Sequence, residues 1–380
     1  MNSSFYGNFK LGILGGGQLG RMLIQEAANF NISISVLDSD KNAPCKELAA
    51  EFVIGDIRDF ETVYQFGKTV DLLTIEIEHV NVDALERLEN EGLLVYPQPK
   101  ILRMIQDKGL QKKFYSDNNI PTAAYFLSEN KTETLSHKAD FPFMQKLRKG
   151  GYDGKGVMKL ASETDIEKSF DAPSVLEKLI DFDKEISVIV ARNKSGETKC
   201  FPPVEMEFNA EANLVEFLFS PASISEKIKT EANEIAIKIA DKLGIVGILA
   251  IEMFITKKDE LLVNEMAPRP HNSGHQTIEG NFTSQYAQHL RAILNLPLGD
   301  TKIILPSVMV NLLGEKNYEG NAKYEGLEEV LAMENSYVHL YGKKTTKPFR
   351  KMGHVTILAE NIEKAKQKAK FVKEKLKVIA

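Results

Sequence analysis

Short apolar runs alternate with amphipathic stretches over the first hundred residues. The apolar runs predict strands at Lys10–Leu14, Ile32–Asp38, Phe52–Ile54 and Leu72–Ile77. The stretches between them predict helices at residues 19–29, Asp59–Gly67 and Val82–Asn90. Strands that alternate with helices at this spacing indicate a parallel sheet with right-handed crossovers. Tyr96-Pro97-Gln98-Pro99 interrupts the pattern, so we expect a domain boundary near residue 98.

The pattern changes beyond that boundary. Between Gln98 and Gly299, helices are predicted over Pro99–Asn118 and Lys227–Leu243. Predicted strands are Phe143–Leu147, Ser174–Leu179, Glu185–Ala191, Ala250–Thr256 and Glu260–Val263. The remainder contains predicted strands at Ser307–Asn311, Tyr337–Tyr341 and His354–Leu358, and a helix from about Ile362. We therefore expect an α/β fold (α+β overall) of three domains: 1–98, 99–300 with a flap subdomain at about 122–180, and a small β-rich domain at 301–380.

Composition and charge narrow the class of protein. Of the 380 residues, 43% are hydrophobic and 27% are charged, which is ordinary for a globular chain. The net charge of −5 provides no basic excess for a nucleic-acid partner, although a local basic patch for a small anion is compatible with it. No apolar run reaches the roughly 18–20 residues of a membrane span. The polar Met1–Lys10 segment and only two cysteines predict a reduced, cytoplasmic, soluble protein without a signal peptide.

A glycine-rich loop follows the first predicted strand. Gly15-Gly16-Gly17-Gln18-Leu19-Gly20 fits the G-x-G-x-x-G pattern before a helix, and Asp38 ends the next strand. Glycines allow close backbone approach, and a helix N-terminus offers free N–H groups to an anion. The anion could be the pyrophosphate of NAD or one phosphate of another ligand; a turn that only packs helix on strand is the structural alternative. By itself, this loop favours a nicotinamide-dependent oxidoreductase.

A second glycine-rich loop argues against that function. Four glycines in seven residues, flanked by lysines, follow the strand Phe143–Leu147 and predict a mobile cationic flap over a polyphosphate. Lys146 lies on that strand, where its ammonium can meet phosphates, and the order of residues is not that of a Walker loop. Further on, Glu177-Lys178-Leu179-Ile180 can present backbone groups to an adenine edge, and Glu185 can accept hydrogen bonds from a ribose.

Carboxylates in the last two strands of the middle domain form the strongest cluster. Glu252 lies within an apolar strand, where a bare charge would be costly, and Asn264-Glu265 closes the predicted partner strand. Two facing carboxylates and an amide oxygen suit Mg²⁺, with nucleotide phosphates completing its shell; a salt bridge to Arg or Lys is the alternative. The following loop contains Arg269, His271 and His275, but it lacks the H-E-x-x-H glutamate of a zinc site. We interpret it as a substrate-orienting loop.

These residues resemble the ATP-grasp superfamily and, within it, the N5-carboxyaminoimidazole ribonucleotide synthetase family. Three stretches carry the closer resemblance: Gly12–Met22, Asn264–His275 and Arg350–His354. The resemblance implies that ATP phosphorylates bicarbonate to carboxyphosphate, and that the amine of 5-aminoimidazole ribonucleotide captures the carboxyl group, in de novo purine biosynthesis. It also implies a homodimer. The sequence departs from the family at Phe208, near which a histidine is common, and at Lys347-Pro348-Phe349, where Arg-Pro-Gly is usual.

The resemblance also assigns site residues, in four groups. The implied ATP contacts are Arg103, Lys146, Gly151, Tyr152, Asp153, Gly154, Lys155, Gly156, Val157, Glu177, Lys178, Leu179, Ile180, Glu185, Asn264 and Glu265. The implied Mg²⁺ ligands are Glu252 and Glu265. The implied catalytic residues, near bicarbonate, are Tyr152, Arg269 and His271. The implied ribonucleotide contacts are Gly17, Gln18, Leu19, Glu76, Arg269, His271, Asn272, Lys343, Arg350 and Lys351, with Glu78 as a neighbour.

Three other functions stay open at this point. A formate-dependent glycinamide ribonucleotide transformylase shares the grasp core, but would be expected to differ at Gly15–Met22 and His271–His275. A nicotinamide-dependent oxidoreductase rests on the first glycine loop alone. A non-catalytic nucleotide-binding protein would not need Lys146, Glu252 and Glu265.

Overall fold

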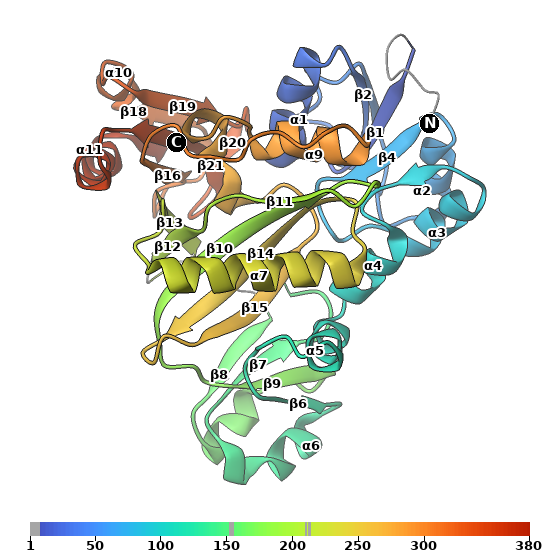
Figure 1. Ribbon diagram of the computed structural model, residues 1–380, viewed down its shortest axis with the longest axis vertical. Coiled ribbons are helices and arrows are strands. Elements are labelled where there is room, and N and C mark those ends of the chain that lie inside the picture. Colours follow the sequence, from blue (N-terminus) through green and yellow to red (C-terminus); the bar gives the residue numbers. More distant parts are fainter. Residues whose placement is uncertain (1–7, 152–155, 210, 212–213) are drawn as a thin grey trace.

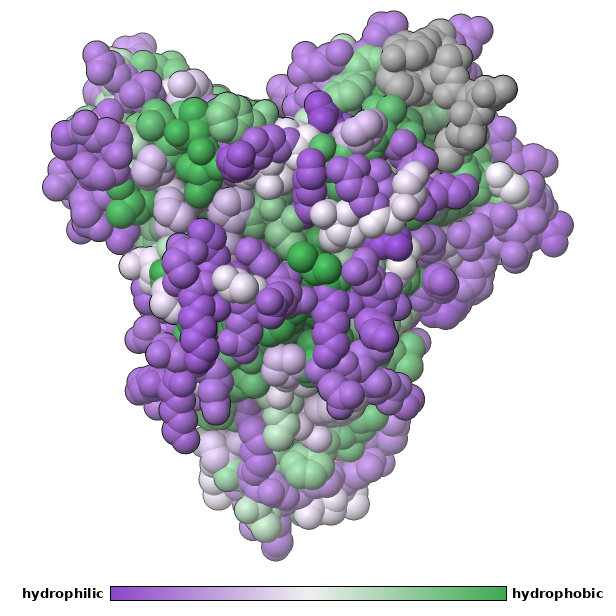
Figure 2. Space-filling model, in the orientation of Figure 1, coloured by the Kyte–Doolittle hydropathy of each residue, from purple (hydrophilic) through white to green (hydrophobic). Residues whose placement is uncertain are grey.

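The computed structural model describes residues 8–151, 156–209, 211 and 214–380 (Figure 1). The ribbon has an N-terminal lobe, a C-terminal lobe and a lower lobe, which meet at a large sheet crossed by helix α7 (Glu226–Leu243). Figure 2 shows a largely hydrophilic face over α7 and a gathering of hydrophobic residues on the C-terminal lobe. Tyr152–Lys155, four of the expected flap residues, lie outside the described residues.

The N-terminal lobe contains the predicted parallel sheet. Its strand order is β3-β2-β1-β4-β5, and all its pairs are parallel. Its elements are β1 (Lys10–Leu14), α1 (Gln18–Asn29), β2 (Ser33–Asp38), β3 (Glu51–Ile54), α2 (Phe60–Gly67), β4 (Leu72–Ile75), α3 (Val82–Asn90) and β5 (Leu94–Val95). Strand β1 is central and apolar, and Leu11 and Ile13 are fully buried, as strands covered on both faces require.

The helix predicted over Pro99–Asn118 is two helices, α4 (Pro99–Ile105) and α5 (Lys108–Asp117). The break occurs at Asp107, which has extended backbone and caps α5 by accepting from the N–H groups of Gly109 and Leu110. Asp is a strong N-cap residue because its carboxylate satisfies otherwise unpaired amides. The prediction of one continuous helix was therefore wrong, and the second helix begins with Lys108, which contacts Glu265.

The lower lobe is a four-stranded antiparallel sheet in the order β6-β9-β7-β8. Its elements are β6 (Tyr125–Ser128), α6 (Lys131–Ser136), β7 (Phe143–Leu147), β8 (Val157–Leu160) and β9 (Ser174–Lys178). The predictions for β7 and β9 are confirmed, to within one residue, whereas β6 and β8 were not predicted. Lys146 on β7 pairs in register with Val157 on β8 and Val175 on β9, so it lies beside both ends of the flap.

A nine-stranded sheet joins the middle of the chain to its C-terminal part. The order is β15-β14-β10-β12-β13-β16-β21-β19, with β11 paired to β10. Its elements are β10 (Phe182–Arg192), β11 (Thr198–Cys200), β12 (Val204–Asn209), β13 (Leu214–Ser220), β14 (Gly247–Thr256), β15 (Leu261–Ala267), β16 (Ser307–Leu313), β19 (Ser336–Leu340) and β21 (Lys351–Leu358). Strands β11, β12 and β13 were not predicted. Because β13 pairs with β16, the sheet crosses the expected boundary near residue 300, and the domain boundaries stay predictions.

Helices cover this sheet and complete the C-terminal lobe. Strand β10 and helix α7 share the largest core cluster, in which Ile186, Val188 and Ile239 are fully buried. The remaining elements are α8 (Thr277–Gly280), α9 (Gln285–Ile293), β17 (Gly320–Asn321), β18 (Lys323–Glu325), α10 (Leu327–Leu331), β20 (Thr345–Thr346), α11 (Ile362–Lys375) and β22 (Lys377–Ile379). Among the described residues, no helix has the length and apolar character needed to cross a membrane.

Candidate active site

Two glutamates face each other at the edge of the nine-stranded sheet. Glu252 on β14 is directly opposite Glu265 on β15, next to a register shift between residues 252 and 253. The hairpin predicted at Lys257–Asp259 produces this pairing, because it turns β14 back on itself as β15. The expected juxtaposition of these two carboxylates is therefore confirmed, while their expected role as metal ligands stays a prediction.

Helix α5 contributes a lysine to this pair. The Lys108 Nζ lies 2.6 Å from the Glu265 Oε2, and the lysine side chain is 20% exposed. The attraction of Lys108 is the main cause that lowers the pKa of Glu265 to about 2, against the opposing effect of burial. Glu265 is therefore ionised at neutral pH, and part of its charge is balanced from within the chain.

A second ion-pair group connects the lower lobe to the same edge. The Lys146 Nζ lies 2.9 Å from Glu177 and donates to the Asn264 Oδ1 at 2.9 Å. The other oxygen of Glu177 lies 3.2 Å from the Nζ of Lys112, which is almost fully buried on α5. Burial alone would raise the pKa of Glu177, but the two ammonium groups hold it below its usual value. Burial lowers the pKa of Lys112 to about 8.

Negative charge accumulates around Glu252. Burial, the charge of Glu265 and the charge of Glu185 raise the pKa of Glu252 well above its usual value. Burial, then Glu265, raises the pKa of Glu185 on β10 to about 7, although Asn264 bonds its side chain. Carboxylates that repel one another in this way are typical of a place where a cation binds. Over the described ranges, no three His, Cys, Asp or Glu side chains form a group that could hold a metal ion unaided.

The loop after β15 places Arg269 and His271 beside these carboxylates. The Arg269 Nε lies 2.9 Å from Glu78, and the His271 Nε2 lies 3.7 Å from the Glu252 Oε1. Asn272 exchanges two amide hydrogen bonds with Asn311 on β16, at 2.9 and 3.0 Å. The C-terminal part of the chain thus fixes the loop, a connection that no local pattern around residue 311 could have indicated.

The first glycine loop is occupied by carboxylates of the chain itself. The Gly16 N–H donates to Asp38 at 2.6 Å, and the Leu19 N–H at the start of α1 donates to Glu76 at 3.2 Å. A Cβ on Gly17 would lie 2.3 Å from the Glu76 carboxylate, so this close approach requires glycine. Burial raises the pKa of Glu76, with Arg269 opposing. Gly17 and Leu19 therefore lie against Glu76, and two amides of the loop that was expected to meet a ligand anion already bind protein oxygens. The expected contact of Gln18 stays a prediction.

The basic residues of the C-terminal lobe are held by backbone oxygens. The Lys343 Nζ donates to the Lys351 carbonyl at 2.6 Å, and Arg350 donates to the Thr345 carbonyl at 2.7 Å. Lys343 and Arg269 both act on the pKa of Glu76, and Lys351 acts on that of Glu252. Lys343 and Lys351 are thus electrostatic neighbours of the carboxylates at the two ends of the candidate site.

Several residues predicted to contact ATP lie outside the ion-pair groups of Glu177, Glu252 and Glu265. Arg103 forms ion pairs with Asp83 and Glu86 of α3 instead. Lys178 bonds Asp140 and lies over the ring of Phe143. Leu179 and Ile180 follow β9 and are half-buried, and Gly151 and Gly156 border the flap residues that the structure does not describe. The roles of these residues stay predictions.

The two histidines of the loop have separate surroundings. His275 is fully buried, and its ring lies 4.6 Å from that of His354 on β21. Its Nδ1 lies 3.2 Å from the Tyr286 hydroxyl, whereas the Nδ1 of His271 contacts Ser273. His275 therefore belongs to the packing between α9 and the C-terminal sheet.

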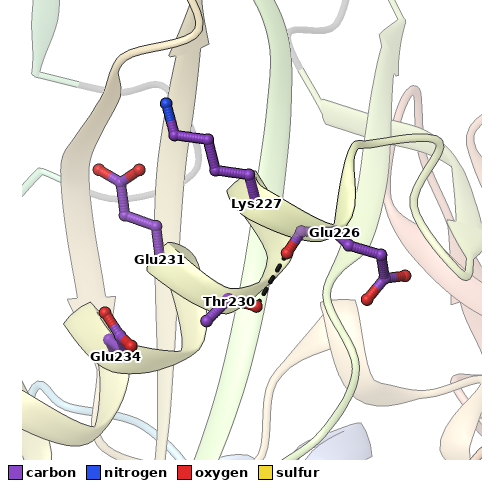
Figure 3. A pocket seen from close by; sticks show the side chains of 5 residues that line it. All are labelled: Glu226, Lys227, Thr230, Glu231 and Glu234. Carbon is purple, nitrogen blue, oxygen red and sulfur yellow. Dashed lines mark hydrogen bonds between the residues drawn. The ribbon is translucent and has the colours of Figure 1, made fainter.

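Surface depressions lie outside this cluster. One, of about 570 Å³, is an open patch on α7, where the Thr230 hydroxyl donates to the Glu226 carbonyl (Figure 3). Another, of about 250 Å³, lies between α1 and β19 and includes Arg21 and His339. Neither contains a predicted site residue.

Comparison with known families divides the chain into three matched parts. Residues 9–106 match the ribonucleotide synthetase preATP-grasp domain, residues 113–286 the ATP-grasp domain, and residues 307–368 the phosphoribosylaminoimidazole carboxylase C-terminal domain. These matches confirm the predicted fold class. They also argue against the oxidoreductase alternative, because the first glycine loop occurs in a preATP-grasp domain.

Individual relatives cover nearly the whole chain. A crystal structure of N5-carboxyaminoimidazole ribonucleotide synthetase from Thermotoga maritima is 44% identical with a TM-score of 0.90, and the match covers 98% of this chain and 99% of that one. A structure from Aspergillus clavatus, in complex with ADP and 5-aminoimidazole ribonucleotide, is 34% identical with a TM-score of 0.88, covering 96% and 98%. The chloroplastic phosphoribosylaminoimidazole carboxylase of Vigna aconitifolia is 37% identical over 93% of this chain, which spans 64% of that protein's length.

Proposed function

Because this chain belongs to the N5-carboxyaminoimidazole ribonucleotide synthetase family, we propose that it carboxylates 5-aminoimidazole ribonucleotide at the expense of ATP. The reaction consumes ATP, bicarbonate and the ribonucleotide, and it releases ADP, phosphate and N5-carboxyaminoimidazole ribonucleotide. The relative from Aspergillus clavatus, solved with ADP and this ribonucleotide, supports the choice of substrates. The observation that carries the proposal is the convergence of Lys146, Glu252 and Glu265 beside Arg269 and His271.

The grasp side of the site suits ATP. Phosphoryl transfer needs charge neutralisation and positioning more than covalent help, and the Lys146 ammonium is held between Glu177 and Asn264 for that task. Glu177 and Lys178 end β9, the strand that pairs with β7, and Leu179 and Ile180 follow it, so the adenine edge can meet backbone groups there. Arg103, Gly151, Gly156, Val157 and Glu185 complete the proposed ATP contacts, together with Tyr152–Lys155.

Glu252 and Glu265 fit Mg²⁺. Their oxygens are hard donors. Burial and then the charges of Glu265 and Glu185 raise the pKa of Glu252, and a cation relieves the repulsion between these carboxylates. Two carboxylates leave most coordination positions to water and nucleotide phosphates, as is usual for this ion. When bound, Mg²⁺ would supply neutralisation of the phosphate charge.

The acceptor side holds the small anion and the ribonucleotide. Arg269 and His271 lie between Glu78 and Glu252, where they can bind bicarbonate and the carboxyphosphate made from it. Glu76 would face the aminoimidazole, and Lys343, Arg350 and Lys351 would bind the ribonucleotide phosphate, with Gly17, Gln18, Leu19 and Asn272 around it. Exclusion of water by the flap would protect carboxyphosphate from hydrolysis.

The test is substrate-dependent release of ADP by the purified chain. We expect ADP only when bicarbonate and 5-aminoimidazole ribonucleotide are both present, with one carboxylated product per ADP. ADP formed equally well with glycinamide ribonucleotide and formate would contradict the proposal and identify a transformylase. Light scattering would test the proposed homodimer separately.

A further inference from the structure

A chain of buried hydroxyl groups leads from the nine-stranded sheet to His271. Ser187 on β10 is directly opposite Glu252 on β14, in the same row as Glu265. The Ser187 Oγ lies 2.8 Å from the Ser273 Oγ, which lies 2.8 Å from the Nδ1 of His271. Both serines are 1% exposed. Two buried hydroxyl groups thus lead in series to one nitrogen of a ring whose side chain is 18% exposed.

The hydrogen bond from a backbone amide indicates which nitrogen of the His271 ring carries the proton. The Ser273 N–H donates to the His271 Nδ1 at 3.3 Å, and an amide N–H can only donate. The Nδ1 is therefore an acceptor, so the proton of the neutral ring is on Nε2. The Ser273 hydroxyl can donate to the same Nδ1 lone pair while it accepts from Ser187.

The backbone of His271 is fixed as firmly as its ring. The buried Gln285 side chain accepts from the His271 N–H at 2.8 Å and donates to the His271 carbonyl at 2.7 Å. Gly274 leaves room for this clamp, since a Cβ there would lie 2.5 Å from the Gln285 Cδ. The Nε2 consequently faces the Glu252 Oε1 at 3.7 Å, longer than a direct hydrogen bond.

We propose that Ser273, supported by Ser187, is a positioning residue that keeps His271 in the tautomer with its proton on Nε2. In this tautomer His271 donates a hydrogen bond to an oxygen of the anion beside Glu252, and it does not act as a base there. The identity of that anion as bicarbonate or carboxyphosphate rests on the proposed function. The tautomer itself does not.

The test is a two-bond ¹H–¹⁵N spectrum of the full-length protein, labelled with ring-¹⁵N histidine. The chain has seven histidines, and the signals absent from a His271→Gln variant assign His271. We expect a protonated Nε2 and an unprotonated Nδ1 in the unsubstituted protein. In Ser273→Ala we expect a mixture of the two tautomers, and in Ser187→Ala a smaller change in the same direction. A proton on Nδ1 in the unsubstituted protein, or an unchanged tautomer in Ser273→Ala, would overturn the proposal.

Steady-state kinetics provide the second readout. Ser273→Ala should lower kcat for carboxylation about tenfold, as loss of an orienting partner commonly does, and leave the KM for ATP unchanged. The matched control is Ser128→Ala in the lower lobe, because Ser128 is also 1% exposed and also bonds a neighbouring hydroxyl; it should change neither readout. If the unsubstituted protein has the Nε2–H tautomer but carboxylates nothing, the proposed function fails while the tautomer assignment stands.

Discussion

The two regions that we propose to bind anions balance charge in different ways. The first region, which we call the grasp edge, is the edge of the nine-stranded sheet at β14 and β15 together with the adjoining β7 and β9. There, acidic and basic side chains from distant parts of the chain pair with one another, as Lys108 does with Glu265 and Lys146 with Glu177. At the glycine loop, backbone amides bind Asp38 and Glu76, and in the C-terminal lobe the cations Lys343 and Arg350 donate to backbone carbonyls. One region is a network of ion pairs between side chains, whereas in the other the charged side chains are hydrogen-bonded to backbone groups.

This difference predicts how each region responds to substitution. Removing one member of a buried charge network leaves its partners uncompensated, which is costly. Removing a side chain that donates to a carbonyl at the surface leaves a carbonyl that water can satisfy. The following predictions test the contrast, beginning with the residue on which most of the network depends.

Glu265→Ala should abolish ATP turnover. Glu265 faces Glu252 and bonds Lys108, so its loss removes a proposed Mg²⁺ ligand and leaves a buried ammonium without its carboxylate. We expect a loss of more than about a hundredfold, because even partners of metal ligands commonly contribute that much. The measurement is ADP release, with circular dichroism to follow folding.

The matched control is Glu260→Ala, an exposed glutamate at the start of the same hairpin strand. It should turn over ATP at the normal rate. Normal turnover by Glu265→Ala would show that Glu265 is not part of the site. It would also contradict the expectation that substitutions in the ion-pair network have the largest effects.

Arg269→Ala should stop carboxylation while ATP still binds. Arg269 is paired with Glu78 at 2.9 Å on the acceptor side, away from Lys146 and Glu177. We expect carboxylated product to fall about a hundredfold, as for loss of one donor to a developing anion, with the Kd for ATP unchanged. Arg192→Ala is the control, since Arg192 also forms a partly buried ion pair, with Asp241. Weakened ATP binding in Arg269→Ala would instead place that residue in the grasp network.

Glu185→Gln should flatten the pH dependence of stability in the ligand-free protein. Burial and the charge of Glu265 raise the Glu185 pKa from 4.5 to about 7. A carboxyl with a raised pKa in the folded state favours folding below pH 4.5, and this contribution is lost as the pH rises through about 7. At pH 8 the free energy of unfolding of the variant, measured with urea, should therefore exceed that of the unsubstituted chain by roughly 1–3 kcal/mol. At pH 5 the difference should be smaller.

The control is Glu207→Gln, an exposed glutamate on β12, which should follow the unsubstituted chain at both pH values. Mg²⁺ with ATP should reduce the difference at pH 8, because a cation stabilises the ionised carboxylates. If the free energy of unfolding of Glu185→Gln depended on pH as it does in the unsubstituted chain, the charges around Glu185 would not perturb its pKa, and the prediction would be wrong.

The fold could be predicted where local pattern and tertiary structure agree. The predicted strand Lys10–Leu14 is β1, and the hairpin between β14 and β15 follows from its turn residues. The strands β12 and β13 were missed because their pattern is mixed and their stability comes from pairing across the sheet to β16. The break between α4 and α5 depends on one cap, Asp107, within an otherwise helical pattern.

The candidate site was predictable only in part, for a similar reason. Carboxylates in apolar strands, such as Glu252, are conspicuous because burial demands a partner. The partners of these carboxylates are not conspicuous in the sequence. Lys108 is 157 positions from Glu265, and nothing near Lys108 in the sequence indicates that contact. The spacing of Lys108 and Lys112 places them on one helix face, and this was the only available signal. That Glu76 fills the glycine loop depends on the pairing of β1 with β4, and thus on the fold.

Arg350→Ala should have the smallest effect, because Arg350 belongs to the region of local contacts. Its guanidinium donates to the Thr345 carbonyl at 2.7 Å and to the Thr345 hydroxyl at 3.0 Å, five positions earlier in β20. We expect the KM for the ribonucleotide to rise about three- to tenfold, the scale of one screened charge contact, with kcat and the urea midpoint unchanged. Added salt should shrink the difference, because ions screen an exposed phosphate contact.

Lys344→Ala, an exposed neighbour with the same charge change, should alter KM less. A large fall in kcat or in stability would show that the C-terminal cations form a network with the carboxylates, as the grasp edge does, and the contrast between the two regions would then be wrong.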